Sequence, residues 1–330
     1  MPASVPSSQR VNFMRPLCVA LCFSSGTFTA GAAEYPVRPV RMIVLFPPGG
    51  SDTVARMLAQ KLSERFHQTF VIDNRPGAAG VIGADIVAKS PRDGYTLLFA
   101  TASFAISAGF DRKLPYDTIK DFSAVGFVAS VPFVLVSHPS VPVTSVQELL
   151  ALAKAKPDQL NAASSGTGGA GHLATEVFKS MSGARIAHIP YKGTGPALTA
   201  VLSGEAQLML ASMGAALPQA RAGKVRALAV SSLKRSSLAP ELPTVAESGV
   251  PGYDAITWYG IAAPRGTSPA VIAILNREIV AVLGTGEFRE RLATLGIEPT
   301  ASTPEEFASY LRSDVAKWTR AIKEARVTLN

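Results

Sequence analysis

Residues 41–66 read RMIVLFPPGGSDTVARMLAQKLSERF, and this stretch decides the fold class. Residues 41–46 form an apolar run that indicates a buried strand, and the PPGG turn ends it. Apolar side chains then recur at helical spacing from Val54 to Phe66. A strand, a glycine-rich turn and a helix in this order begin a βαβ unit. We therefore predict an α/β protein with parallel strands.

The same cycle continues along the chain, and a second set of βα units begins at Val131. Further strands are predicted over residues 70–73, 95–100, 133–137, 160–164, 186–189, 207–210, 226–230 and 256–262. Helices are predicted over residues 52–66, 80–89, 171–181 and 195–202. Three more helices are indicated by their starts: a capping box at Ser145 and Glu148, and a capping residue before proline at Ser268 and at Thr303.

A secretory signal peptide is predicted at the amino terminus. Arg10 and Arg15 precede a short apolar stretch and a run of small residues that ends at Ala33. The apolar stretch is too short to remain in a bilayer, and no later segment reaches the roughly 20 apolar residues of a membrane helix. Cleavage after Ala32 or Ala33 fits the small-residue rule, and we favour Ala33, which makes residues 1–33 the signal. A lipid anchor on Cys22 is the rival interpretation, which bulky Leu21 disfavours.

The composition of the mature chain excludes several classes of function. Both cysteines, Cys18 and Cys22, lie inside the signal, so disulfides, thiolate metal ligands and a cysteine nucleophile are unavailable after cleavage. Removing two arginines and no acid lowers the formal net charge from +8 to +6, which suits an anionic ligand or simple solubility. The basic residues are scattered and no stripe of aromatic and basic residues is present, so we expect no nucleic-acid binding.

Three glycine-rich turns between a predicted strand and a predicted helix are the candidates for a binding site. They are PPGGSD (47–52), SSGTGGAGH (164–172) and PYKGTGPA (190–197). Glycine lets the backbone approach a ligand closely, and the free N–H groups and dipole of the following helix attract an anion. Simpler interpretations stand beside this one: glycine is common in α/β turns, His172 suits a structural cap or a loop-holding residue, and Lys192 suits a solvated surface position.

An enzymatic function is the weaker hypothesis. The letters GTGGAG match the dinucleotide fingerprint formally, but the next strand ends in HIPYKG, without the acid that would bind a ribose hydroxyl. No GxSxG elbow, HExxH motif or P-loop is present, and the four histidines show no spacing typical of metal ligands. We therefore expect no enzyme activity, no cofactor and no metal site, with a dinucleotide-dependent enzyme as the alternative.

Taken together, the motifs resemble the Bug family, the substrate-binding proteins of tripartite tricarboxylate transporters. The resemblance covers residues from about 35 to about 318 and rests on motifs that follow one another in order: PPGGSDTVAR, VIDNRPGAAGVIGA, PRDGYTLLFATAS, LPYDTIKDF, SSGTGGAGHLA, IPYKGTGPAL, GKVRALAVSS and LPTVAESGVPGY. It implies a two-lobed type II periplasmic binding protein fold, with a central ligand cleft and two crossing strands. Lobe one would comprise residues 34–130 and 256–330, and lobe two residues 131–255.

The resemblance also implies a function: a monomeric periplasmic protein that captures a small carboxylate and passes it to the membrane subunits of such a transporter. An orphan sensor that feeds a two-component signalling system is the alternative, since it would have the same cleft. In Bug proteins, backbone donors, hydroxyls and ordered water of both lobes hold the ligand's carboxylate without a salt-bridging arginine. The corresponding residues here are Gly49, Gly50, Ser51, Asp52, Thr101, Ser103, Ser164, Ser165, Gly166, Gly168, Gly169, His172, Tyr191, Lys192, Gly193 and Ser212.

Two positions depart from the family pattern. Only Ser51 separates Gly50 from Asp52, one residue fewer than in the family's PPGGxxDxxAR, so the family's donors in this loop do not transfer to this chain position by position. Ala211 stands where many relatives carry an aspartate. The absence of that acid argues against an amino-acid ligand, because a ligand amino group would lack its acidic partner.

Overall fold

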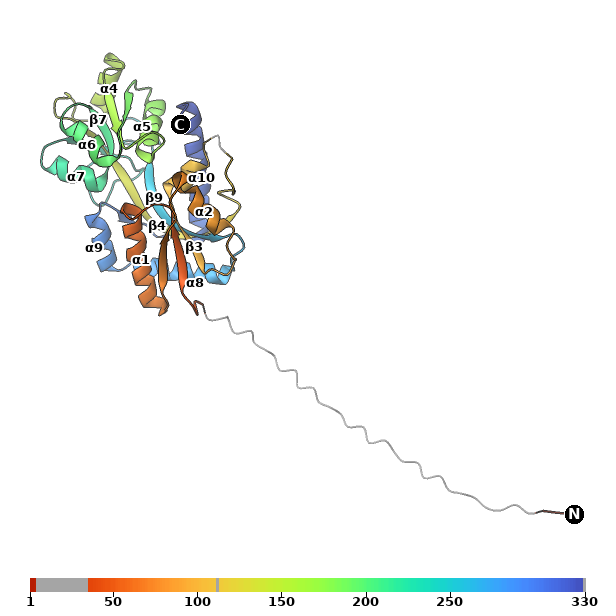
Figure 1. The fold of residues 1–330 in the computed structure, drawn as a ribbon. Helices are drawn as coiled ribbons and strands as arrows, with labels where there is room; N and C mark the ends of the chain where they lie inside the picture. Colours follow the sequence, from red (N-terminus) through yellow and green to blue (C-terminus); the bar gives the residue numbers. More distant parts are fainter. Residues whose placement is uncertain (4–34, 111–112, 329–330) are drawn as a thin grey trace. The chain divides into compact units, whose positions relative to one another are not determined.

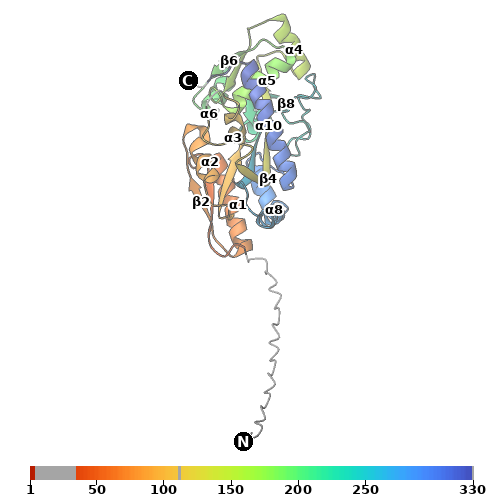
Figure 2. The same ribbon diagram turned by 90° about the vertical axis from the view of Figure 1, so that its right-hand side faces the viewer.

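The predicted parallel strands are present, and they belong to two sheets that share one long strand. The computed structural model describes residues 1–3, 35–110 and 113–328. The predicted signal peptide falls almost entirely outside these residues, so its cleavage remains a prediction. Residues 35–330 form one compact unit, which Figures 1 and 2 show from two sides.

The first sheet forms lobe one. Its strand order is β2 (Phe70–Asn74), β1 (Val40–Val44), β3 (Thr96–Thr101), β9 (Ile256–Pro264) and β4 (Phe122–Ser137), and the short β10 (Glu298–Pro299) also pairs with β4. Strands β1, β2 and β3 are parallel, as the βαβ pattern predicts. Strand β9 is antiparallel to both β3 and β4, so β4 runs in the same direction as β1 and β3.

The second sheet forms lobe two around the carboxyl-terminal part of β4. There β4 pairs antiparallel with β8 (Arg226–Val230) and with β7 (Leu208–Ser212). Strands β5 (Asn161–Ser164) and β6 (Ala187–Pro190) continue the sheet parallel to β7. The return to lobe one passes from Ser231 to Ala255, which are joined by a backbone hydrogen bond just before β9 begins.

These strand directions bring the glycine-rich turns to facing positions. Strands β1 and β3 point their carboxyl ends along β4 toward lobe two, whereas β5, β6 and β7 point theirs back toward lobe one. In open α/β sheets, ligands bind outside the carboxyl ends of the strands. The turns that the sequence singles out therefore lie at the ends of the two sheets that are directed at each other.

Helices cover both sheets. The amino-terminal part of lobe one contains α1 (Gly50–Phe66), the 3-10 helix η1 (Ala78–Gly80), α2 (Val81–Ala88) and α3 (Ala102–Ser107). Lobe two adds α4 (Val146–Ala155), α5 (Ala170–Ser182), α6 (Thr194–Leu202) and α7 (Met213–Arg221). The carboxyl-terminal part contributes α8 (Pro269–Leu283), α9 (Gly286–Thr294) and α10 (Pro304–Glu324). The predicted helices are confirmed, whereas α3, α7 and α9 were not predicted.

Helices α10 and α4 begin at capping residues that the sequence indicates. Thr303 forms a complete capping box with Glu306 at the start of α10. At α4 the box is shifted: the Ser145 hydroxyl accepts from the Glu148 amide, but the Glu148 carboxylate accepts from Thr144 rather than from Ser145. Both helices begin where the sequence predicts.

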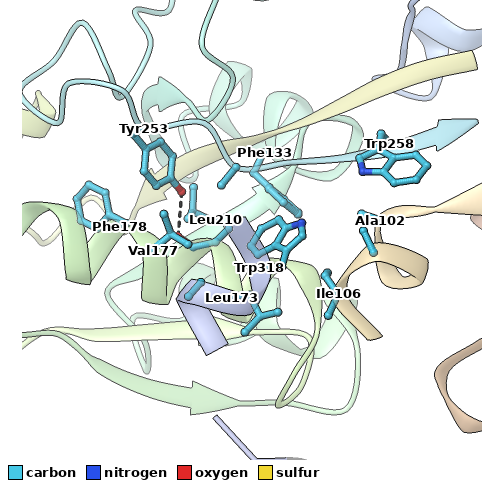
Figure 3. Close-up of a cluster of buried hydrophobic side chains, with 14 of the residues drawn as sticks. Ala102, Ile106, Phe133, Leu173, Val177, Phe178, Leu210, Tyr253, Trp258 and Trp318 are labelled. Carbon is cyan, nitrogen blue, oxygen red and sulfur yellow. Dashed lines mark hydrogen bonds between the residues drawn. The ribbon is translucent and has the colours of Figure 1, made fainter. Parts of the chain in front are cut away.

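Helix α10 packs against both lobes. It contacts β4, α3 and α8 in lobe one and α5 in lobe two. In Figure 2 it runs along the molecule from the level of α8 to that of α5. Figure 3 shows Trp318 of α10 beside Leu173 of α5 and Ala102 of α3, all buried in one apolar cluster. This core joins the lobes on one side.

No helix within the part of the chain that the structure describes is by itself long and apolar enough to cross a membrane, although α8 and α9 pass that test as a pair with a 71° bend between them.

Candidate functional site

The first glycine-rich loop ends at the amino terminus of α1. Gly49 caps this helix with φ +153°, a conformation that favours glycine, and both Gly49 and Gly50 are exposed. Thr53 donates its amide to Gly49 O, so the intrahelical hydrogen bonds start there. The amides of Gly50, Ser51 and Asp52 therefore have no acceptor within the helix, as at any helix start.

The side chain of Asp52 turns inward. It is only 4% exposed, and its carboxylate accepts from Asn74 Nδ2 at 2.9 Å and from Arg56 Nε at 2.9 Å. Although burial opposes the shift, these hydrogen bonds lower the pKa of Asp52. Asn74 also donates to Phe46 O. Asp52 thus anchors the loop to the end of β2, while its backbone amide remains at the helix start.

The end of β3 brings two hydroxyls to the same edge of lobe one. Thr101 Oγ1 and Ser103 Oγ lie 2.6 Å apart in a hydrogen bond. Thr101 is buried and Ser103 is half-buried. Helix α3, which begins between them, contacts α5 of lobe two, so these hydroxyls lie near the junction of the lobes.

The loop after β5, residues 164–169, is held by its own hydrogen bonds. The amide of Gly166 donates to Ser164 Oγ at 3.2 Å, that of Gly168 to His172 Nδ1 at 3.0 Å and that of Gly169 to Gly166 O at 3.3 Å. Gly166 and Gly168 have φ values of +137° and +76°, whereas that of Gly169 is −71°. The three glycines therefore shape the loop, and their amides already have acceptors.

The backbone amides that lack an acceptor belong to residues next to these three glycines. The amide of Thr167 has no acceptor among the residues that the structure describes. Those of Ala170 and Gly171 begin α5 and have no intrahelical acceptor, because Leu173 is the first residue to donate within the helix, to Gly169 O. Sequence reasoning missed these three amides, since a glycine-rich pattern does not tell which N–H groups are satisfied internally. Ser165 is exposed beside them.

His172 occupies the loop-holding role that the sequence left open. Its side chain is 5% exposed and accepts the amide of Gly168. Its ring also stacks on His188 of β6, with 3.7 Å between the ring centroids. Sequence reasoning did not select His188, because it lies 16 positions from His172 and no local pattern connects them.

The loop after β6 is tied to the loop after β5. Tyr191 and Gly193 donate their amides to Ser164 O and Ser165 O, at 2.9 and 3.2 Å. The Tyr191 hydroxyl donates to Glu205 Oε1 at 2.8 Å, which together with partial burial raises the pKa of this tyrosine. Lys192 is exposed and has no ion pair within the described part of the chain. The free donors here are the amides of Thr194 and Gly195 at the start of α6.

Ser212 ends β7 and caps α7. It is half-buried, and its hydroxyl has no hydrogen-bond partner among the described residues. Its neighbour Ala211 is fully buried in the core of lobe two, in register with Val134 of β4. Gly214, in the first turn of α7, packs against Gly296 of lobe one so closely that a Cβ on Gly214 would lie 2.4 Å from Leu295 O.

A hollow of about 650 Å³ lies between α5 and α10, away from these loops. Its charged lining is largely self-satisfied: Lys317 pairs with Asp314 at 2.7 Å, and Ser180 donates to Glu324. No helix begins at this groove, so it offers no set of free amides. The facing loops are the stronger candidate for an anion site.

Together these features define a class of protein. The fold has two α/β lobes, and the strand ends of each lobe direct helix starts toward the other lobe: α1 from lobe one, and α5, α6 and α7 from lobe two. This is the fold of a periplasmic solute-binding protein. Residues 54–327 match the tripartite tricarboxylate transporter family receptor, and the chain belongs to this family.

Individual relatives agree with that assignment. BugT of Bordetella pertussis is 39% identical over 328 residues, which cover 97% of this chain and 100% of BugT. A solved structure of an R. palustris protein with adipate is 38% identical, has a TM-score of 0.74 and covers 89% of this chain and 99% of that one. MatC from Rhodopseudomonas palustris with bound malate is 29% identical, has a TM-score of 0.70 and covers 87% of this chain and 100% of that one. The resemblance to Bug proteins and the two-lobed fold are thereby confirmed.

Proposed function

We propose that this protein captures a small carboxylate between its lobes and delivers it to the membrane subunits of a tripartite tricarboxylate transporter. The observation that carries the proposal is the set of free helix-start amides on facing strand ends: Gly50 and Ser51 in lobe one, and Ala170, Gly171, Thr194 and Gly195 in lobe two. Each such start attracts negative charge through unpaired N–H groups and the helix dipole.

The positions of the charged side chains around these loops favour an anion that is held by N–H groups and not by an ion pair. Lys192 is exposed at the edge of its loop, and Arg56 is engaged by Asp52. A ligand with a carboxylate at each end could meet one lobe with each end. The two solved relatives hold adipate and malate, which are dicarboxylates of different length. We therefore infer a di- or tricarboxylate or an aromatic acid as the ligand.

The sixteen residues selected from the sequence remain our proposed site, with roles refined by their contacts. Gly166, Gly168, Gly169, Gly193, Asp52 and His172 hold the loops in shape. Ser103, Ser165 and Ser212 supply hydroxyls, and the helix-start amides supply the remaining donors. We also propose that the lobes divide near residues 130 and 256, where β4 and β9 leave the first sheet, and that the mature protein is a periplasmic monomer.

A thermal-shift panel tests the ligand class. A ligand at 100 times its dissociation constant stabilises the folded state by about 2.7 kcal/mol. For a chain of this length, that should raise the melting midpoint by roughly 3–8 °C. Among di- and tricarboxylates, aromatic acids, amino acids, nicotinamides and sugars, we expect shifts only from carboxylates, with malate and adipate as the first probes. Shifts from NAD or sugars and from no carboxylate would refute both the ligand class and the helix-start mechanism.

A further inference from the structure

Two histidine rings lie face to face beneath the loop after β5. The ring of His172, on α5, and that of His188, on β6, have centroids 3.7 Å apart and planes inclined by only 14°. His172 is buried and His188 is half-buried. Each ring is attached to one end of the loop: Ser164 Oγ lies 2.6 Å from His188 Nε2, and Gly168 donates its amide to His172 Nδ1.

The hydrogen bond from Gly168 fixes the tautomer of His172, and the contact with Ser164 fits a His188 ring whose Nε2 carries no proton. Because Gly168 N–H donates to Nδ1, that nitrogen of His172 carries no proton, and the ring proton is on Nε2, 3.7 Å from Glu176 Oε1. Ser164 Oγ accepts the amide of Gly166 and has one proton of its own to donate. When Nε2 of His188 carries no proton, Ser164 Oγ can donate this proton to it. The alternative acceptor, Gly166 O, lies farther away at 3.3 Å.

The surroundings of the rings favour this neutral state. Burial, followed by the neighbouring His172, lowers the pKa of His188 to about 4. The titratable groups that act on His188 all lie on α5: His172, Glu176 and Lys179. Glu176 is itself paired with Lys179 at 2.8 Å, so its negative charge is already compensated and stabilises a protonated ring only weakly.

We propose that His188, together with His172 stacked on it, positions the loop at residues 164–169, and that protonation of the pair releases the loop and the bound carboxylate. This inference rests on the proposed function only for the ligand. A proton on His188 Nε2 turns that nitrogen into a donor, so the proton of Ser164 must move to Gly166 O. A proton on His172 Nδ1 leaves it facing the N–H of Gly168, donor against donor. Two stacked cations would also repel each other, so the pair cannot take up a second proton without separating the rings.

The direct test needs no ligand. The amide resonance of Gly168 in ¹H–¹⁵N spectra of the mature protein, followed from pH 8 to pH 3.5, should titrate together with the imidazole resonances of His188. In His188→Gln, whose amide oxygen can still accept from Ser164 but cannot be protonated in this range, the transition assigned to His188 should vanish. His67→Asn, at an exposed position in lobe one, is the matched control and should leave the titration unchanged. A Gly168 amide that is indifferent to pH would overturn the proposal.

Ligand binding gives the second readout. With malate and adipate as probes, the apparent affinity of the wild type relative to His188→Gln should fall about tenfold for each pH unit below the midpoint, because the competent fraction of the loop falls in proportion. Comparing the two proteins at the same pH cancels the protonation of the probe itself. Near pH 7.5 the two should bind within about threefold of each other. Parallel pH profiles would refute the switch, whereas failure of both proteins to bind any carboxylate at pH 7.5 would count against the proposed function and leave the spectroscopic test to decide.

Discussion

Replacing Gly168 by valine tests whether the loop after β5 works through its backbone shape. Gly168 has φ +76°, in the left-handed region that a β-branched residue rarely adopts. Holding valine there costs about 1–3 kcal/mol, so the variant loop should relax to another conformation. That relaxation removes the hydrogen bond from Gly168 to His172 and displaces the free amides of Thr167 and Ala170. Since 1.4 kcal/mol is a factor of ten, the apparent affinity for a carboxylate should fall by about 5- to 150-fold.

Three companion variants distinguish a loss of affinity at the site from a general loss of stability caused by backbone strain. Gly183, at the other end of α5, has φ +68° with nothing within 4 Å of its missing Cβ, so Gly183→Val carries the same strain away from the loop. It should destabilise the fold similarly and leave affinity unchanged. Gly169→Ala should cost less than Gly168→Val, because its φ of −71° suits alanine and the only tight contact of the new Cβ is Gly166 O at 3.3 Å. Lys192→Ala should lower affinity by less than about threefold, as is usual for an exposed charge.

The assay is calorimetric titration with the strongest carboxylate of the thermal-shift panel, beside urea unfolding of each variant. Equal losses of stability in Gly168→Val and Gly183→Val, with a loss of affinity only in the former, would assign the effect to the site. Binding that survives Gly168→Val but disappears in Lys192→Ala would refute this reasoning, because a direct ion pair would then hold the ligand.

Three further expectations concern export, motion and pH. Mass spectrometry of protein from the cell envelope should show a mature chain that begins at Ala33 or Glu34, and a cytoplasmic pool that retains Met1 would contradict export. Small-angle scattering should show a modest contraction on saturation with a verified ligand, since lobes that close around a ligand move as units, and an unchanged radius would count against the hinge. Between pH 6.5 and about 4 the unfolded chain binds a proton at His188 that the folded chain does not, so the free energy of unfolding should fall as the pH falls through this window. Discounted for the partial exposure of the ring, the loss is about 1–2 kcal/mol, and urea unfolding of His188→Gln should lack it.

Local sequence patterns predicted the helices and strands that depend only on residues close together in the chain. The helix expected over residues 171–181 spans Ala170–Ser182, and the strand expected over residues 41–46 spans Val40–Val44. Strand β4 was recognised only in part, at residues 133–137. Gly126 and Pro132 interrupt its apolar pattern, and its register shifts after Ala124 and Phe127. Its continuity depends on tertiary contacts, because the first part of β4 pairs with β9 and its last part pairs with β7.

The helices that were missed lack the usual local signals. Helix α3 reads ASFAIS and has no capping side-chain hydrogen bond, and α7 contains Pro218. In the site, the sequence located the loops but could not assign their donors. Whether Gly168 donates to a ligand or to His172, and whether Asp52 faces a ligand or Asn74, depends on side chains that approach from other elements.

The shared apolar core constrains how the lobes can move. Trp318 is fully buried between α3 and α5, beside Ala102 and Leu173 (Figure 3). Exposing a side chain of this size would cost several kcal/mol at about 25 cal/mol per Å² of apolar surface. Opening should therefore leave α10 in contact with both lobes and separate them on the opposite side, where the start of α1 faces lobe two. The same rotation would carry the amides of Gly50 and Ser51 away from those of Ala170 and Gly171. Because the donors of one lobe alone meet only one end of a dicarboxylate, closure is the step that completes the site.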